Sequence, residues 1–221
     1  MVPTEDAELF ALMERKLYAA VICDTLDELG YRNQAMNERL RPLDLERVTI
    51  GRAKPMLTTD VYHIADNCYE KEIEAIDSIR PLEVVVAGTN RSTRNGLWGE
   101  LLSTAAKMRG ARGAIIDGLI RDTGKIAALG FPVYCTGFKP VDSKGRGLLI
   151  DYDNPVEVGD VLVRKGDVVF GDRDGVVVIP REALRETVEG ALRKVESEND
   201  TRRELLEGKL LREVYDKYGV L

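Results

Sequence analysis

The chain has 221 residues, of which 44% are hydrophobic and 32% are charged, and its formal net charge is −6 at pH 7. The acidic balance argues against a broad nucleic-acid-binding face, no apolar run has membrane-spanning length, and the N-terminal residues lack the features of a signal peptide. We therefore expect a cytoplasmic protein with neither nucleic acid nor membrane as a partner. One histidine and three widely spaced cysteines exclude a histidine-rich zinc site and a disulfide framework. A metal would be held mostly by oxygen, which indicates Mg²⁺ or Mn²⁺.

Two helices are expected near the N-terminus, followed by a strand and a third helix. Apolar residues recur at helical spacing over residues 8–17 and 21–29. Residues 47–59 are rich in β-branched side chains and alternate loosely, which predicts a strand with an irregularity at its proline. Residues 65–79 are typical of a helix, with three isoleucines at helical spacing.

The middle of the chain alternates between strand and helix patterns. Strands are expected at 84–87, 114–117 and 132–135, and helices at 99–108 and 124–129. Alternation with short loops predicts a parallel sheet with right-handed crossovers. Ligands of open α/β sheets bind beyond the carboxyl ends of such strands.

From Gly147 the pattern changes to short β segments separated by tight turns. The segments are residues 148–150, 156–158, 161–163, 167–170 and 175–179. They predict a second, antiparallel or mixed sheet. A long helix over 181–198 then begins a charged helical tail that runs to Leu221. We expect residues 1–221 to form a single domain with two sheets and peripheral helices, the helical tail beginning at about residue 181.

The sharpest cluster of functional side chains is Glu100 with the adjacent pair Arg121 and Asp122. Glu100 falls in the first turn of its helix, where the backbone N–H groups of Leu101 and Leu102 are free to bind an anion. The guanidinium of Arg121 matches a carboxylate. Asp122, with Glu100 directly or through water, supplies hard oxygen ligands for a divalent cation with open positions. This combination suits a 2-oxo acid, whose carboxylate and keto oxygens lie side by side.

The same residues have a purely structural interpretation. Acidic side chains are favoured at helix N-termini by the helix dipole. Asp122 could cap the helix that starts at Thr123, and Arg121 and Asp122 could take part in surface ion pairs. The pattern of residues by itself leaves both interpretations open.

Several motifs resemble the RraA-like family. They are residues 98–106, the twenty residues between Glu100 and Arg121, the segment 131–133 with Gly137, residues 142–146, and the strand 174–180. The resemblance runs from about Cys23 to the C-terminus. It implies an α/β fold, a single-domain β/β/α swivelling-type sandwich with peripheral helices, assembled as a homotrimer or as a hexamer of two trimers with sites between subunits.

The family includes class II 4-hydroxy-4-methyl-2-oxoglutarate / 4-carboxy-4-hydroxy-2-oxoadipate aldolases and a regulator of ribonuclease activity. For its aldolases, the resemblance implies that Asp122 ligates Mg²⁺ or Mn²⁺ and that Arg121 binds the pyruvyl group. It also implies that the amides of Leu101 and Leu102, after Gly99, bind the pyruvate carboxylate.

Two acidic positions depart from a simple transfer of the family pattern. Glu100 stands where the aldolases usually have an aspartate that helps to hold metal-bound water, so direct ligation by the longer side chain is an alternative. The aldolases also take a glutamate from the C-terminal helices of the adjoining subunit. Glu196 and Glu198 are candidates for it, and we favour Glu198 as a metal ligand.

The functional hypothesis is a divalent-metal-dependent lyase. It would cleave a small 4-hydroxy-2-oxo acid to pyruvate and a second carbonyl compound, and would decarboxylate oxaloacetate as a side activity. The alternative is a non-catalytic regulator that binds an RNA-degrading enzyme. Asp24, Asp27, Arg52, Arg94 and the tail are the candidates for the distal end of the substrate pocket.

Overall fold

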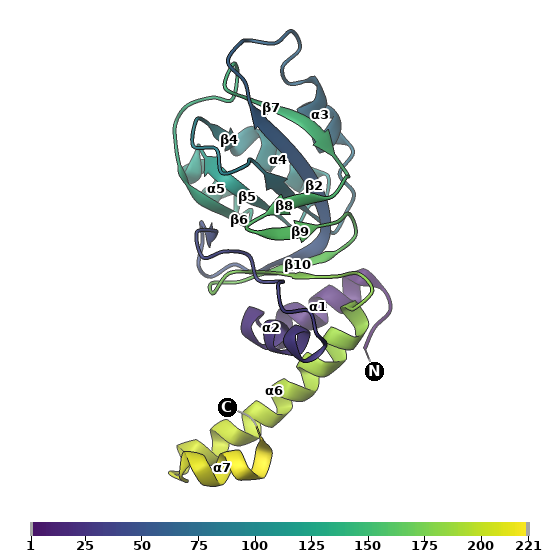
Figure 1. The fold of residues 1–221 in the computed structure, drawn as a ribbon, viewed down its shortest axis with the longest axis vertical. Coiled ribbons are helices and arrows are strands. Elements are labelled where there is room, and N and C mark those ends of the chain that lie inside the picture. Colours follow the sequence, from purple (N-terminus) through teal and green to yellow (C-terminus); the bar gives the residue numbers. More distant parts are fainter. Residues whose placement is uncertain (1, 220–221) are drawn as a thin grey trace.

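The computed structural model of the protein describes residues 2–219, so Met1 and the last two residues of the predicted tail lie outside the described part. Within that part the chain forms seven helices and eleven strands (Figure 1). The helices are α1 (Asp6–Lys16), α2 (Ala19–Glu28), α3 (Glu70–Asp77), α4 (Glu100–Met108), α5 (Thr123–Leu129), α6 (Leu184–Leu206) and α7 (Leu211–Tyr218). The strands are β1 (Arg41–Pro42), β2 (Thr49–Asp60), β3 (Glu83–Gly88), β4 (Gly96–Trp98), β5 (Gly113–Ile120), β6 (Val133–Phe138), β7 (Gly147–Tyr152), β8 (Val156–Val158), β9 (Val161–Val163), β10 (Val168–Gly171) and β11 (Val176–Ile179).

The predicted parallel sheet is confirmed. β3 pairs in parallel with β2 and with β5, and β5 pairs in parallel with β6. Helix α4 lies in the connection from β3 to β5, and α5 lies in the connection from β5 to β6. Every residue of β3 is buried, as expected for a parallel strand that is covered on both faces.

The predicted second sheet is wrong for most of its segments. β7 and β10 both pair antiparallel with β2, and β11 pairs with β10, so all three belong to the main sheet. β2 makes this possible because it is twelve residues long and has room for β10 and then β7 along the edge opposite β3. In the described chain only β8 and β9 form a separate two-stranded sheet.

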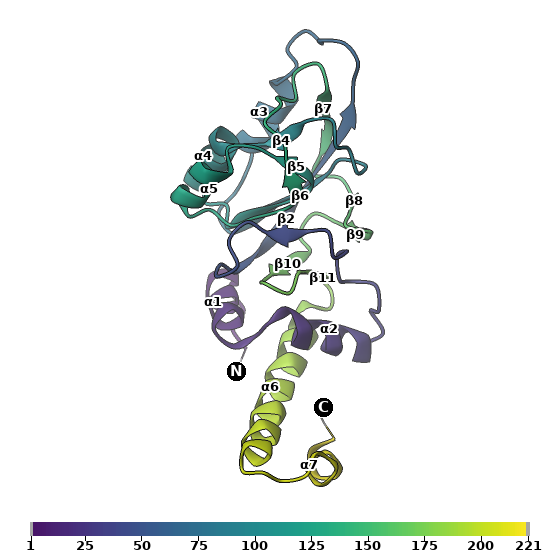
Figure 2. The same ribbon diagram turned by 90° about the vertical axis from the view of Figure 1, so that its left-hand side faces the viewer.

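The main sheet is the middle layer of a sandwich, which confirms the predicted β/β/α arrangement. Along β3, Val84 and Val86 pack with the valines of the β8–β9 hairpin, whereas Val85 and Ala87 pack with buried residues of α3, α4 and α5. The alternation follows from the two-residue period of a strand. Figure 2 shows α4 and α5 on one side of the sheet and β8 and β9 on the other.

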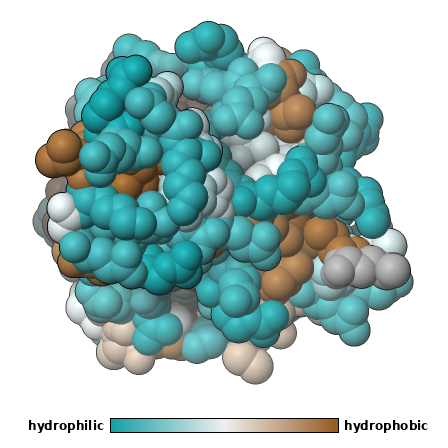
Figure 3. Space-filling view, turned by 90° about the horizontal axis from the view of Figure 1, so that it is seen from below, coloured by the Kyte–Doolittle hydropathy of each residue, from teal (hydrophilic) through white to brown (hydrophobic). Residues whose placement is uncertain are grey.

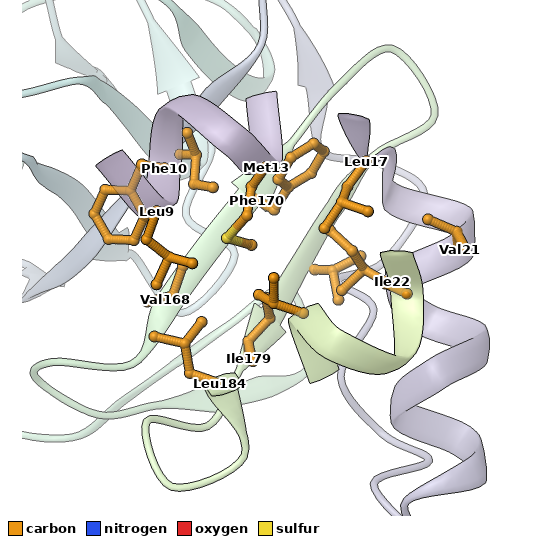
Figure 4. Close-up of a cluster of buried hydrophobic side chains, with 14 of the residues drawn as sticks. Leu9, Phe10, Met13, Leu17, Val21, Ile22, Val168, Phe170, Ile179 and Leu184 are labelled. Carbon is orange, nitrogen blue, oxygen red and sulfur yellow. The ribbon is translucent and has the colours of Figure 1, made fainter. Parts of the chain in front are cut away.

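A third cluster of buried residues joins the terminal helices to the sheet. Side chains of α1, α2 and α6 pack against one end of β2, β10 and β11 (Figure 4). Phe10, Met13, Ile22, Phe170 and Ile179 have no exposed surface. This cluster holds the N-terminal and C-terminal segments together at the end of the molecule away from α4.

Beyond this cluster the chain extends as a C-terminal arm, defined here as residues 202–218. The arm projects away from the sheet, with α7 folded back against the end of α6 (Figures 1 and 2). Glu204 of α6 accepts hydrogen bonds from Lys217 and Tyr218 of α7. The arm carries exposed apolar side chains: Leu206, Leu210, Leu211 and Tyr215. Seen from this end, the surface is mainly hydrophilic with separate hydrophobic patches (Figure 3).

The predicted boundaries agree with the structure to within two residues for α1, α2, α4 and α5, and differ further for α3 and α6. Residues 65–79 were expected to be helical throughout, but α3 covers only Glu70–Asp77, and Asn67 has a positive φ that interrupts a helix. The long helix starts at Leu184 and runs to Leu206, eight residues beyond the predicted end. None of the helices in the described part is long and apolar enough to cross a bilayer.

The layered packing predicts where truncation is costly. Ile115→Ala on β5, which has no exposed surface, should lower the free energy of unfolding by about 2–5 kcal/mol because it leaves a cavity between the layers. Ile150→Ala on β7 is the matched control, since Ile150 is 41% exposed, and should cost less than about 1 kcal/mol. Urea denaturation measures both values, and equal losses would contradict the layer assignment.

Candidate functional site

The turn after β5 lies beside the start of α4. β4 pairs in parallel with the end of β5, and the backbone N–H of Arg121 donates to the carbonyl of Trp98 at 2.8 Å. Glu100, two residues after Trp98, is the first residue of α4. The expectation that Arg121 and Asp122 adjoin the N-terminus of this helix is therefore confirmed.

Asp122 directs its carboxylate at α4 and not at its own helix. It is the N-cap residue of α5 by position, with φ 57° and ψ 30°, but among the described residues its side chain makes no capping hydrogen bond there. Its Oδ2 instead lies 3.4 Å from the backbone N of Glu100 and accepts a hydrogen bond. A Cβ on Gly99 would lie 2.8 Å from the same oxygen, so a glycine is needed for this approach.

Arg121 is held between two carboxylates. Its Nε lies 3.6 Å from Oδ2 of Asp122, and its Nη1 lies 3.1 Å from Oδ1 of Asp142. Asp142 is fixed in turn by Tyr69, whose hydroxyl donates to Oδ2 at 2.6 Å. The guanidinium is therefore oriented by two ion pairs, and no described residue accepts a hydrogen bond from its Nη2.

The hydrogen bonds of this network also determine its ionisation. Burial raises the pKa of Asp142, but the bonds from Tyr69 and from backbone N–H groups, together with the charge of Arg121, lower it below its ordinary value overall. The bond to Asp142, with burial, raises the pKa of Tyr69 to about 12. Asp142 is therefore an anion and Tyr69 a neutral donor at neutral pH.

These residues line a cavity of about 370 Å³. Its wall is formed by the β5–α5 turn, the start of α4, one face of α3 and the loop before β7. The lining residues are Tyr69, Glu72, Ile73, Leu97, Gly99, Leu101, Leu102, Arg121, Asp122, Asp142 and Ser143. Five of the predicted site residues are thus brought together, namely Gly99, Leu101, Leu102, Arg121 and Asp122.

Glu100 begins the same helix, but its carboxylate is engaged elsewhere. Its Oε1 accepts a hydrogen bond from the hydroxyl of Thr104, one turn further along α4, at 3.0 Å. Glu100 does not line the cavity. The backbone of Glu100 therefore contributes to the site through its N–H, whereas its side chain lies along the outer surface of α4.

Glu198 lies in a different part of the chain's fold. It is on α6, at the opposite end of the molecule from α4 (Figure 1). Its carboxylate accepts a hydrogen bond from the Tyr18 hydroxyl, and both residues line a second hollow of about 340 Å³ between α2 and α6. Glu196 is exposed on the same helix. Within one chain neither glutamate approaches Asp122.

The residues expected at the distal end of the pocket are also elsewhere. Arg52 pairs with Asp6, Arg94 stacks over the ring of Tyr62, and Asp24 pairs with Lys194. None of the four side chains named for this end, Asp27 included, lines the cavity. Within one chain that expectation is wrong, because Asp24 and Asp27 lie on α2 and Arg52 lies within β2, and neither element lines the cavity.

The α3 wall of the cavity was not expected from the sequence. Tyr69, Glu72 and Ile73 follow one another at helical spacing, and the isoleucine was assigned to the apolar face. Ile73 is 55% exposed. The sequence signal that could have identified this wall is an isoleucine that directly follows a glutamate and lies one helical turn after a tyrosine. Burial and the charge of Asp142 raise the pKa of Glu72 to about 7, against the opposing effect of Arg121.

Among the described residues, the cavity offers few side-chain ligands for a divalent cation. No group of three or more acidic, histidine or cysteine side chains that could hold a metal occurs among residues 2–219. Asp122 presents a carboxylate to the cavity, and Mg²⁺ in proteins is commonly bound by one or two carboxylates with water and substrate completing the shell. Asp122 is the side chain here that suits this role.

The family model described as RraA-like (Aldolase/RraA) matches residues 19–178. An uncharacterized protein of Methanocaldococcus jannaschii is 42% identical over 119 residues, 53% of this chain and 56% of that protein. A Halorhodospira halophila protein, provisionally named a 4-hydroxy-4-methyl-2-oxoglutarate aldolase, is 32% identical over 73% of this chain and 94% of its own length. The match to the Legionella pneumophila protein DlpA spans 27% of that longer protein.

Solved structures share the fold over nearly the whole chain. A structure described as one of novel cellulases from gut-associated microbes has a TM-score of 0.82 and 31% identity, covering 92% of this chain and 89% of its own. Streptomyces coelicolor RraAS2, described as an unusual member of the RNase ES inhibitor RraA protein family, has a TM-score of 0.79 and 29% identity, covering 90% and 98%. With its cavity at the β5–α5 turn and the family model matching most of its length, this chain belongs to the RraA-like family.

Proposed function

We propose that this protein is a divalent-metal-dependent class II aldolase. It cleaves a 4-hydroxy-2-oxo acid to pyruvate and a second carbonyl compound, and it decarboxylates oxaloacetate through the same pyruvate enolate. The observation that carries the proposal is the placement of Arg121, Asp122 and the first turn of α4 on the wall of one cavity. The aldolase names given to relatives such as the Halorhodospira halophila protein support it.

The substrate carboxylate is bound by the start of α4. The N–H groups of Leu101 and Leu102 precede the first complete helical turn and have no acceptor within the helix. Both residues line the cavity. Helix N-termini favour anions because their free N–H groups and the helix dipole act together.

Arg121 stabilises the negative charge that develops on the 2-oxo group as the C3–C4 bond breaks. Its guanidinium is already oriented by Asp122 and Asp142, so little reorganisation is needed during the reaction. Asp122 would hold Mg²⁺ or Mn²⁺ at the same wall. When bound, such an ion acts as a Lewis acid that polarises the keto oxygen.

The alternative is a regulator that binds an RNA-degrading enzyme without chemistry of its own. The likeness to Streptomyces coelicolor RraAS2, described as an RNase ES inhibitor relative, favours it. The net charge of −6 suits a basic partner. The open cavity with an oriented arginine is the reason to place the aldolase first, since a docking role does not require either feature.

The C-terminal arm supports the expected homotrimer or hexamer. Leu206 on this arm is 84% exposed, and three more apolar side chains of the arm are exposed beside it. Apolar surface of this kind marks a contact with another chain. Assembly would also give Glu198 of one copy a route to the cavity of another.

The catalytic proposal predicts a metal-dependent reaction that is lost without Asp122. Purified protein should release pyruvate from oxaloacetate and from 4-hydroxy-2-oxo acids with Mg²⁺ or Mn²⁺, and a chelator should abolish the release. Asp122→Ala should lower kcat/KM by about 100-fold or more. Asp66→Ala, an exposed acid outside the cavity, is the control. Turnover that is indifferent to chelator and to Asp122→Ala would contradict the mechanism.

If no pyruvate is released with either metal, the aldolase proposal fails and the regulator becomes the better candidate. The matching measurement is inhibition of a ribonuclease E-type enzyme by the purified chain. Inhibition by the wild-type protein and by Asp122→Ala alike would support a docking role that does not use the cavity.

The glycine before α4 should be as sensitive as the charged residues. Gly99→Ala adds a methyl group 2.8 Å from Oδ2 of Asp122 and should lower kcat by about 10–100-fold, because displacing one reacting group by an ångström is sufficient. Gly124→Ala is the matched control, since a Cβ at Gly124 meets no atom within 4 Å. Wild-type kcat in Gly99→Ala would show that the approach of Asp122 to α4 is not required.

The assembly should depend on the arm. Sedimentation analysis of the wild-type protein is expected to give a trimer or hexamer. The double substitution Leu206→Glu and Leu211→Glu should shift it to smaller species, because it places charges in an apolar contact. Leu162→Glu on β9, also an exposed leucine, should leave the mass unchanged. A wild-type monomer would contradict the assembly.

A further inference from the structure

The α3 wall of the cavity carries a carboxyl group that the proposed mechanism does not use. Tyr69, the residue before α3, donates a hydrogen bond to Asp142, whereas Glu72 of α3 has no hydrogen bond or ion pair among the described residues. Ile73 lies next to it and is 55% exposed. Once the 2-oxo acid end of a substrate is bound by Arg121 and the start of α4, Glu72 and Ile73 remain to contact the distal end.

Within one chain, the charges of the cavity leave no partner for a second substrate carboxylate. Arg121 is the one cationic side chain among the described lining residues, and it is already paired with Asp122 and Asp142. With Glu72 ionised, the four charged side chains and a divalent ion together carry no net charge. One substrate carboxylate is compensated by the free amides of α4, but a second one would face Glu72 and Asp142.

Basic residues near the cavity do not change this balance. Arg146 donates to the backbone carbonyls of Asp142 and Lys144, and Lys71 donates to the carbonyl of Ile150. Neither of these side chains, nor that of Lys144, lines the cavity. The distal wall is therefore acidic at Glu72 and apolar at Ile73.

We propose that Glu72 makes this site selective for 4-hydroxy-2-oxo acids whose distal substituent is uncharged, over those whose distal substituent is a carboxylate. The inference rests on the proposed function, because it takes the 2-oxo acid end to be bound by Arg121. The selectivity proposed for this chain differs from the substrate that the names of its relatives indicate, since 4-hydroxy-4-methyl-2-oxoglutarate carries a distal carboxylate. Like charges brought together in a partly buried site disfavour binding strongly.

The ionisation of Glu72 sets the pH range of this selectivity. Burial and the charge of Asp142 raise its pKa to about 7, and Arg121 opposes them. The other titratable side chains facing the cavity are Asp122 and Tyr69. Because a raised pKa means that the group loses its proton only above about pH 7, discrimination against a distal carboxylate should be stronger at about pH 8.5 than at about pH 6.

The test compares two uncleavable ligands that differ only at the distal end. 2-Oxopentanoate ends in a methyl group and 2-oxoglutarate ends in a carboxylate, and neither has the 4-hydroxyl group needed for cleavage. Titration calorimetry with Mg²⁺ at about pH 8.5 should give a Kd for 2-oxopentanoate that is about tenfold or more lower. In Glu72→Gln the two Kd values should fall within about threefold, through tighter binding of 2-oxoglutarate.

Glu74→Gln is the matched control, because Glu74 is an exposed glutamate of the same helix that does not line the cavity. Its Kd ratio should equal that of the wild-type protein. Three results with the wild-type protein alone would overturn the proposal. They are equal binding of both ligands, tighter binding of 2-oxoglutarate, and binding of neither ligand. An unchanged ratio in Glu72→Gln would overturn the role of that residue.

A different measurement, the release of pyruvate, tests the proposed function. If 4-hydroxy-2-oxopentanoate and 4-hydroxy-4-methyl-2-oxoglutarate both release no pyruvate while the ligand ratio is as expected, the aldolase is contradicted and the selectivity of the cavity stands. If pyruvate is released faster from the dicarboxylic substrate, the aldolase stands and the selectivity is contradicted.

Discussion

The contact between the Asp122 carboxylate and the N-terminus of α4 is the interaction on which the candidate site depends. It requires three things at once: the parallel pairing of β4 with β5, the left-handed conformation of Asp122, and a residue without Cβ at Gly99. Together they place an acid, a guanidinium and a set of free backbone amides on one wall. The helix dipole stabilises the acid there, so the same geometry serves both folding and ligand binding.

The rest of the fold provides a rigid support for this wall. β2 connects the parallel strands to β7 and β10, so a single sheet runs through the molecule and carries packed layers on both faces. The helices at the termini form their own cluster at the far end and extend into the C-terminal arm. The arm is thus available for contacts between copies.

Different charged residues of the cavity account for binding of the 2-oxo acid group and for selectivity at the distal end of the substrate. Arg121 is oriented by Asp122 and Asp142, which suits recognition of the 2-oxo acid that all candidate substrates share. Glu72 lies on a different element and is free of such pairing. Members of one fold family can therefore keep the first group of residues and vary the second, which is consistent with relatives described both as aldolases and as an RNase inhibitor relative.

The sequence alone determined the features that arise within a few residues of one another. The alternation of strands and helices, the position of Arg121 and Asp122 directly after β5, and the start of α4 were all predicted, because hydrophobic periodicity and glycine positions act locally. The family resemblance correctly indicated the layers of the fold and is confirmed by the family model.

Tertiary structure decided what depends on partners far apart in the chain. Tyr69 and Asp142 meet across seventy-three positions, and β10 joins β2 across more than a hundred, so neither contact has a local signal. Glu100 was predicted beside Asp122, but a hydroxyl on its own helix binds its carboxylate. Which side chains share the cavity is therefore set by how distant elements pack, and local pattern could place Glu72 on a helix but not in the site.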